Sequence, residues 1–232
     1  MLPRFDVRLL QGLEGGKWLA ILLMATSHLG MAIGGELTWP AFWIGRVCAP
    51  IFCFIIIARL AEKPAERSLR YLVRLSAWSV PAQLPFSLWT APFGFHFNVL
   101  VTLALGTGVI WVWVRGYRVI AALLAAALLI PAGWFDLGLI APAAMLIGYA
   151  LLPRSPSLSA LAISACYATA LLYARPHDLL APALCLLTPA AIALCAPLSS
   201  RLVRLPGWAF YAFYPVHIGL IYLIFGPCPM PE

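Results

Sequence analysis

The chain has 232 residues, of which 63% are hydrophobic and only 10% are charged. Soluble domains carry about 25% charged residues, so this composition excludes an ordinary soluble protein. The net charge of +7 lies in short loops between apolar runs, a pattern that encodes membrane topology and argues against a nucleic-acid partner. We therefore expect residues 1–232 to form a single integral-membrane domain in a lipid bilayer.

Apolar runs recur along the chain from Lys17 onward, each close to the roughly 20 residues that a helix needs to cross a bilayer. Proline and glycine mark most of the junctions between them. The predicted helices cover residues 17–34, 40–60, 69–89, 97–114, 117–133, 136–152, 157–174, 178–196 and 207–225. The predicted fold class is therefore all-α, a polytopic membrane protein with about nine transmembrane helices.

The placement of basic residues orients these helices. A cytoplasmic N-terminus puts the following residues on the cytoplasmic side: Arg4, Arg8, Lys17, Arg59, Lys63, Arg67, Arg70, Arg74, Arg115, Arg118, Arg154, Arg201 and Arg204. The opposite side keeps only Arg46 and Arg175. This bias follows the positive-inside rule and predicts a cytoplasmic N-terminus and a periplasmic C-terminus.

Several functional classes lack their signatures in the sequence. There is no inverted repeat of the kind found in many secondary transporters. There is no Walker or Rossmann phosphate-binding pattern. The six cysteines lie in or beside apolar segments without metal-type spacing, so we interpret them as small apolar residues and predict no metal site.

A few polar side chains fall within or at the ends of the predicted helices, where they are costly and usually face a bundle interior or a cavity. They are His28 in the first helix, Arg46 in the second, His96 and Asn98 at the start of the fourth, Asp136 at the start of the sixth and His217 in the last. In the predicted topology all of them lie between mid-membrane and the outer face.

Each of these residues also has a structural interpretation. His28 and His217 would hydrogen-bond neighbouring helices. Arg46 would extend its charge to the interface, and Asp136 would be a helix N-terminal charge favoured by the helix dipole. The basic residues within 59–74 are either a topology and lipid-contact signal or a grip for the phosphates of a nucleotide-like donor.

Five strings resemble, in order, the conjugative pilin acetylase family of TraX-type and TrbP-type proteins. They are the run from Lys17 to His28-Leu29-Gly30, the Gly-Arg-x-x-x-Pro-x-Phe stretch from Gly45, the segment 71–86, the Asn-x-x-x-Thr-Leu segment from Asn98 and the closing Tyr-x-x-Tyr-Pro-x-His that ends at His217. Ser27 stands where the family usually has Asp, and residues 115–200 match weakly. A more distant similarity is to integral-membrane acyltransferase-3 enzymes, whose first helix also carries a basic residue followed by a histidine.

The resemblance implies N-acetylation of a pilin subunit in the bacterial inner membrane during pilus biogenesis, with acetyl-CoA as donor. An imidazole suits the removal of a proton from an N-terminal amine, so His28 is the first candidate for the base and His217 a second imidazole. The remaining catalytic candidates are Arg46 and Asn98, as oxyanion donors, and Asp136. The candidates for contact with the donor are Lys17, Arg70 and Arg74.

Two alternatives stay open from the residues alone. One is another covalent maturation of pilin, such as head-to-tail cyclisation, which needs no acetyl-CoA and suits polar residues that lean toward the outer face. The other is a non-enzymatic role in pilus assembly. Acetylation predicts a tunnel that opens to the cytoplasm beside basic residues, whereas cyclisation predicts a groove that opens only outward.

Overall fold

The computed structural model describes residues 4–62, 64–129, 140–174, 177–203 and 206–228. Every regular element within these ranges is a helix, which confirms the all-α prediction. The helices are α1 (Arg4–Gln11), α2 (Leu13–Ile33), α3 (Thr38–Ala61), α4 (Pro64–Trp89), α5 (Val99–Val114), α6 (Arg118–Ala127), α7 (Ile140–Leu151), α8 (Pro156–Ala174), α9 (Leu180–Leu186), α10 (Thr188–Leu194), α11 (Ala196–Ser199) and α12 (Gly207–Phe225), with single turns η1 (Gly35–Leu37) and η2 (Ala91–Phe93).

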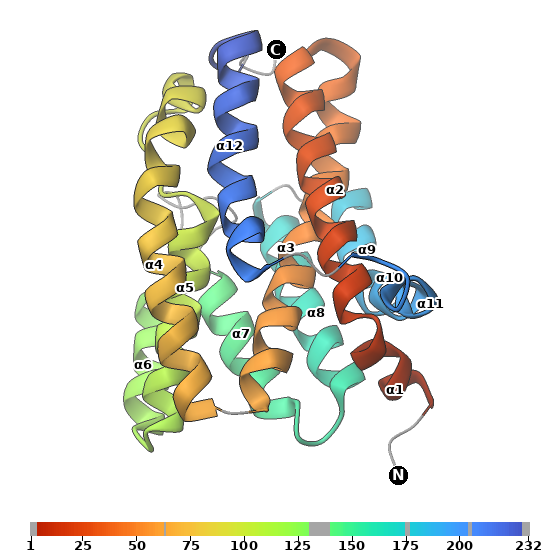
Figure 1. The fold of residues 1–232 in the computed structure, drawn as a ribbon, viewed down its shortest axis with the longest axis vertical. Helices are drawn as coiled ribbons and strands as arrows, with labels where there is room; N and C mark the ends of the chain where they lie inside the picture. The colour runs from red at the N-terminus through yellow and green to blue at the C-terminus, as the bar shows by residue number, and fades with distance from the viewer. Residues whose placement is uncertain (1–3, 63, 130–139, 175–176, 204–205, 229–232) are drawn as a thin grey trace.

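The long helices form an up-and-down bundle (Figure 1). The last helix, α12, lies between α2 and α4 and packs on both, so the first long helix and the last helix of the chain are neighbours. Helix α3 packs along α2, and α5 packs against α4. Helices α5 to α8 fill the half of the bundle that is lower in Figure 1, away from the C-terminus.

Small residues allow the first two long helices to approach closely. A Cβ added at Gly45 of α3 would lie 2.1 Å from Ser27 Oγ and 2.6 Å from Ser27 Cβ on α2. Small residues at such crossings let membrane helices pack backbone to backbone. The contact fixes α2 against α3 one residue before His28 and one before Arg46, so both side chains start from a rigid crossing.

Four of the described helices are long and apolar enough to cross a membrane: Leu13–Ile33, Pro40–Ala61, Pro156–Tyr173 and Gly207–Phe225. They indicate a multi-pass membrane protein. Helix α4 is long, but it carries Arg67, Arg70 and Arg74 in its first half. Helices α5, α6 and α7 are apolar but have only 16, 10 and 12 residues. The predicted number of nine spans and their orientation stay predictions.

The segment predicted as one helix over 178–196 is instead divided into α9, α10 and α11. Pro189 is the second residue of α10 and Pro197 the second of α11, and Pro182 is the third residue of α9. Proline has no N–H to donate and is tolerated only in the first turn of a helix, so each proline starts a new short helix. The three pieces lie beside the lower part of α2 in Figure 1.

One end of the bundle, which we call the basic end, holds the N-terminus and the α3–α4, α5–α6 and α7–α8 connections (Figure 1). Its described basic residues include Arg8, Arg59, Arg67, Arg115, Arg118 and Arg154. Helix α1 is anchored there by Asp6, whose buried carboxylate accepts hydrogen bonds from the Ser157 backbone N–H and from the hydroxyls of Ser155 and Ser157. This carboxylate therefore satisfies the N-terminus of α8, where a negative charge is favoured.

Candidate functional site

Two histidines 189 residues apart meet where α12 crosses α2. His28 Nδ1 lies 2.8 Å from His217 Nε2. Their rings are nearly coplanar and meet edge to edge, with centroids 5.1 Å apart and an interplanar angle of 10°. Both side chains are buried, at 8% and 9% exposure. The structure thus brings the two predicted imidazoles into direct contact.

The hydrogen bonds assign the proton positions in the neutral pair. His217 Nδ1 lies 2.8 Å from the Phe213 carbonyl oxygen, which only accepts, so His217 carries its proton on Nδ1. Its Nε2 then accepts, and His28 Nδ1 must donate to it. The unprotonated nitrogen of His28 is therefore Nε2, which has no hydrogen-bond partner among the described residues. This is the protonation state of a general base.

Aromatic rings enclose the pair. The Trp89 ring is 5.0 Å from the His28 ring and edge-on to it. Tyr214, almost fully buried, is edge-on to both imidazoles at 6.3 Å and 5.6 Å. Phe213 stacks on His217 at 4.6 Å. Such surroundings exclude water and strengthen electrostatic interactions within the site.

Arg46 follows Gly45, the residue of α3 that packs on Ser27 just before His28. Its guanidinium carbon sits 4.3 Å from the centre of the Phe42 ring. The Arg46 Nε is buried and has no hydrogen-bond partner among the residues that the structure describes. The prediction that Arg46 belongs with His28 is therefore consistent with its place in the fold.

Asn98 occupies a different position. It is fully buried as the N-cap of α5, and its side-chain oxygen accepts from the backbone N–H groups of Leu100 and Val101. Its amide nitrogen donates to the Ser79 carbonyl and to Gln83 Oε1, both at 2.9 Å. Both polar atoms of the amide are thus already engaged in holding the start of α5 against α4.

Two predicted residues remain, His96 and Asp136, and two further polar residues, His177 and Asp178, stand at the turn before α9. His96 Nδ1 lies 3.2 Å from the Gly94 carbonyl, and His177 is exposed. Neither is hydrogen-bonded to the histidine pair in the described part of the chain. Asp178 caps α9 and accepts a hydrogen bond from Trp43 Nε1 at 2.7 Å. Asp136 lies outside the described residues.

A narrow, largely apolar channel of about 110 Å³ leads from the neighbourhood of Lys17 to Tyr214. Its lining residues are Lys17, Met24, Phe52, Ile55, Ile56, Tyr71, Leu75, Val99, Leu100, Leu103, Gly207, Phe210, Tyr211 and Tyr214. The partly exposed Lys17 and the exposed Gly207 lie at one end, and Tyr214, in contact with both imidazoles, at the other. The channel therefore runs from the side of Lys17 to the Tyr214 ring, which lies beside the histidine pair.

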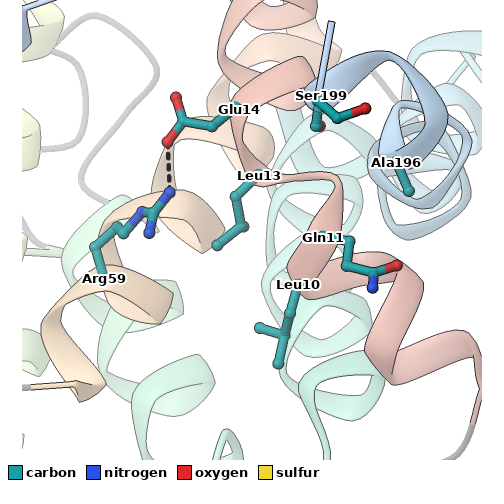
Figure 2. A pocket seen from close by; sticks show the side chains of 8 residues that line it. Leu10, Gln11, Leu13, Glu14, Arg59, Ala196 and Ser199 are labelled. Atoms are coloured by element: carbon teal, nitrogen blue, oxygen red, sulfur yellow. Dashed lines mark hydrogen bonds and ion pairs between the residues drawn. The ribbon is translucent and has the colours of Figure 1, made fainter. Parts of the chain in front are cut away.

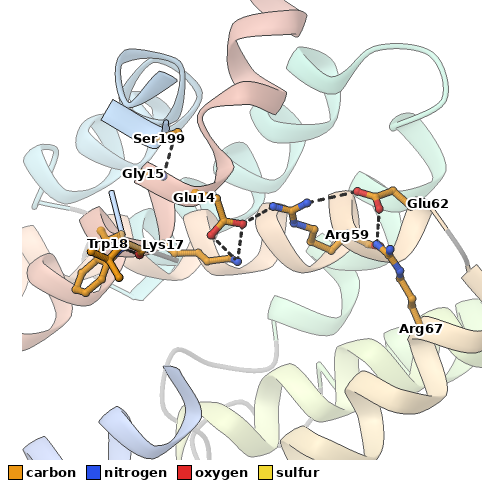
Figure 3. A network of polar contacts seen from close by, with 9 residues as sticks. Glu14, Gly15, Lys17, Trp18, Arg59, Glu62, Arg67 and Ser199 are labelled. Carbon is orange, nitrogen blue, oxygen red and sulfur yellow. Dashed lines mark hydrogen bonds and ion pairs between the residues drawn. The ribbon is translucent and has the colours of Figure 1, made fainter. Parts of the chain in front are cut away.

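Charged side chains gather near the Lys17 end of the channel, as Figure 3 shows. Lys17 Nζ lies 2.9 Å from Glu14 Oε1, and Glu14 is also paired with Arg59 of α3. Arg59 in turn pairs with Glu62, which also binds Arg67 of α4. Sequence reasoning missed Glu14, although its position three residues before Lys17 on a helix favours such an ion pair.

Figure 2 shows a second, more open hollow of about 490 Å³ on the other side of Glu14. It is lined by Leu10, Gln11, Leu13, Glu14, Arg59, Ala196, Ser199 and Ser200. The Gly15 N–H donates to Ser199 Oγ at 2.9 Å, which ties α11 to α2 beside the hollow. The pair of Glu14 and Arg59 therefore borders this hollow, while Lys17, bonded to the same Glu14, borders the channel.

Of the donor-contact candidates, only Lys17 lines the channel. Arg74 is exposed, and its Nη1 would be 3.9 Å from a Cβ at Gly207, which places it at the channel end. Arg70 is exposed on the same helix. Trp89, in contact with His28, carried no sequence signal, because an aromatic residue at the end of an apolar helix is common.

Comparison with known proteins gives one result on the family. No curated protein and no solved structure matches the chain. The family model described as TraX protein matches residues 13–225, which include both histidines, Arg46 and the whole channel. The chain belongs to the TraX protein family.

Proposed function

We propose that this protein transfers an acetyl group from acetyl-CoA to the N-terminal amine of a pilin subunit in the bacterial inner membrane. The TraX family is associated with acetylation of F-pilin. The single observation that carries the proposal is the oriented histidine pair, which leaves His28 Nε2 unprotonated and lies beside Tyr214, the residue at the inner end of the channel.

The reaction needs one base and a place for one proton. The neutral amine attacks the thioester carbonyl carbon, the new C–N bond forms, and His28 Nε2 takes the proton that the amine loses. The tetrahedral intermediate then collapses, the C–S bond breaks, and the thiolate receives that proton from His28. An N-terminal amine has a pKa of about 7.7–8.0, so an imidazole base is well matched to it.

His217 is the positioning residue in this proposal. The Nε2 of His217 accepts the hydrogen bond from His28 Nδ1–H. It remains an acceptor when His28 becomes an imidazolium, so His217 stabilises the charged base. An aspartate performs this task in the Ser-His-Asp triad. In this chain Ser27 replaces the aspartate usual in the family, and Ser27 is instead packed against Gly45. The partner that orients the imidazole comes from α12.

The channel supports a donor that enters at its Lys17 end, beside basic residues. Lys17 lines its outer end, Arg74 lies near Gly207 at the same end, and an ion-pair chain leads from Lys17 through Glu14, Arg59 and Glu62 to Arg67. This excess of positive charge suits the phosphates of coenzyme A. The apolar walls beyond suit its uncharged arm and thioester. Because cyclisation of pilin needs no such entrance, the channel favours acetyl transfer.

Arg46 and Asn98 receive different roles. The buried, unpartnered Nε of Arg46 supports a contact with substrate beside His28. We propose that Asn98 acts by holding the first turn of α5, since Val99 and Leu100 of that turn line the channel.

The test is the intact mass of the pilin from cells that carry the wild-type protein, a deletion, His28→Ala or the control His96→Ala. The proposal predicts an acetyl-sized increment with wild type and with His96→Ala, and none with the deletion or His28→Ala. A pilin mass lower by one water, seen only in cells that carry this protein, would show that the reaction is cyclisation and not acetylation. The same pilin mass in all strains would refute both reactions.

A further inference from the structure

Trp89 carries a buried hydrogen-bond donor that nothing satisfies. It is the last residue of α4 and is 4% exposed. Its indole Nε1 has no hydrogen-bond partner among the described residues. Buried polar groups are almost always hydrogen-bonded in folded proteins, so an orphan of this kind calls for an explanation. Its ring is 5.0 Å from that of His28 and edge-on to it, so the indole that carries the orphan donor packs beside the proposed base.

We infer that the Trp89 indole N–H donates a hydrogen bond to the acyl carbonyl oxygen while that oxygen becomes an oxyanion. The inference rests on the proposed acetyl transfer at His28. When the amine attacks, the carbonyl π electrons move to oxygen, and they return when the C–S bond breaks. The indole keeps its proton throughout and contributes only a hydrogen bond. Trp89 is thus a catalytic residue of the acyl site.

The backbone around Trp89 is held firmly, as an oxyanion donor requires. The Cys228 backbone N–H donates to the Trp89 carbonyl at 2.7 Å. Cys228 follows α12, the helix that carries His217, so the segment after α12 fixes the end of α4. The next residue, Thr90, bonds the Phe86 carbonyl through both its N–H and its hydroxyl. One set of contacts therefore positions both the orienting histidine and the indole donor.

A second tryptophan shows that burial without a partner is not sufficient. Trp111 Nε1 is also buried and has no hydrogen-bond partner in the described ranges. It lies in the last turn of α5, where Arg115 stacks over its ring at 5.2 Å. No ring contact with either imidazole of the pair involves Trp111 among the described residues. What distinguishes Trp89 is the combination of an orphan N–H with the edge-on contact to His28.

The experiment replaces Trp89 by β-(3-benzothienyl)alanine, which keeps the bicyclic shape and removes only the N–H. Trp89→Phe is the second variant, and Trp111→Phe is the control that removes another buried, unpartnered indole N–H. Each protein is purified, and steady-state kinetics are measured with acetyl-CoA and with unmodified pilin from the deletion strain. Thermal unfolding of each variant is recorded alongside.

The inference predicts a kcat about 10²- to 10³-fold lower for both Trp89 variants, the range found for loss of one oxyanion donor. The KM for acetyl-CoA stays within about threefold, because the hydrogen bond strengthens only in the transition state. Trp111→Phe keeps wild-type kcat. A benzothienylalanine variant that folds and keeps kcat within about threefold of wild type overturns the inference. If the wild-type protein itself transfers no acetyl group, the proposed function fails, whereas an active wild type with an inactive His28→Ala leaves it standing and removes only the role of Trp89.

Discussion

Replacing His217 by Phe tests the histidine pair most selectively. The substitution removes the acceptor of His28 Nδ1–H and keeps an aromatic ring that can stack on Phe213 as His217 does. His28 then no longer has a partner that fixes its tautomer or stabilises its charged form. Because the site is aromatic and apolar, the new ring is compatible with the packing there.

The magnitude follows from the hydrogen bond that is lost. A hydrogen bond to a charged group contributes about 1.5–3 kcal/mol, and about 1.4 kcal/mol corresponds to a tenfold change in rate. His217→Phe should therefore lower kcat by roughly 10- to 150-fold. His28→Ala removes the base itself and should lower kcat by about 10²- to 10⁴-fold.

The assay is acetyl transfer by the purified variants, with a double mutant to complete the cycle. Because His217 acts only through His28, the double mutant His28→Ala/His217→Phe should match His28→Ala within about threefold. Two results would refute the reasoning. One is a His217→Phe variant whose kcat is within about twofold of the wild-type kcat. The other is a double mutant whose kcat lies below that of His28→Ala by the same factor by which His217→Phe alone lowers kcat.

Three further predictions concern the fold and the donor entrance. Gly45→Ala should lower the melting temperature of the purified protein, because the new Cβ would lie 2.6 Å from Ser27 Cβ. The control is Gly108→Ala, whose Cβ would meet Leu72 at an ordinary 3.7 Å. Equal melting temperatures for the two variants would contradict the close α2–α3 crossing. Asp6→Asn should destabilise the protein by about 1–3 kcal/mol, because the acceptor at the start of α8 loses its charge and the new amide N–H group faces the N–H and O–H donors of Ser157. Denaturant unfolding in detergent measures the change, and an unchanged unfolding midpoint would contradict the prediction. Lys17→Met should raise the KM for acetyl-CoA several-fold with little change in kcat. Lys17 lines the channel, but it lies about 16 Å from His28 along the helix and so cannot touch the reacting atoms. An unchanged KM would exclude Lys17 from donor binding.

The sequence predicts the helical class, and it selects the two histidines as candidates. Both follow from local features, namely long apolar runs and ionisable residues inside them. It does not predict that His28 and His217 touch, because this depends on how α12 packs between α2 and α4. Residues 189 positions apart carry no local sign of their contact.

Other differences have equally physical reasons. A hydropathy window averages over 178–196, yet the positions of Pro182, Pro189 and Pro197 decide that this segment forms three short helices. Asn98 has the residue type of an N-cap, and the structure shows it in that position. Trp89 could not be selected from the sequence, because its significance lies in an unmatched N–H and a neighbouring imidazole.

The most direct test of the central claim is the transfer of a labelled acetyl group. Purified protein is incubated with acetyl-CoA that carries a deuterated acetyl group and with unmodified pilin, and the pilin N-terminal peptide is analysed by mass spectrometry. We predict the deuterated acetyl group on the N-terminal amine with the wild-type protein and with His96→Ala, and its absence with His28→Ala. An unlabelled N-terminus after incubation with the wild-type protein, or equal labelling by His28→Ala, would contradict the account.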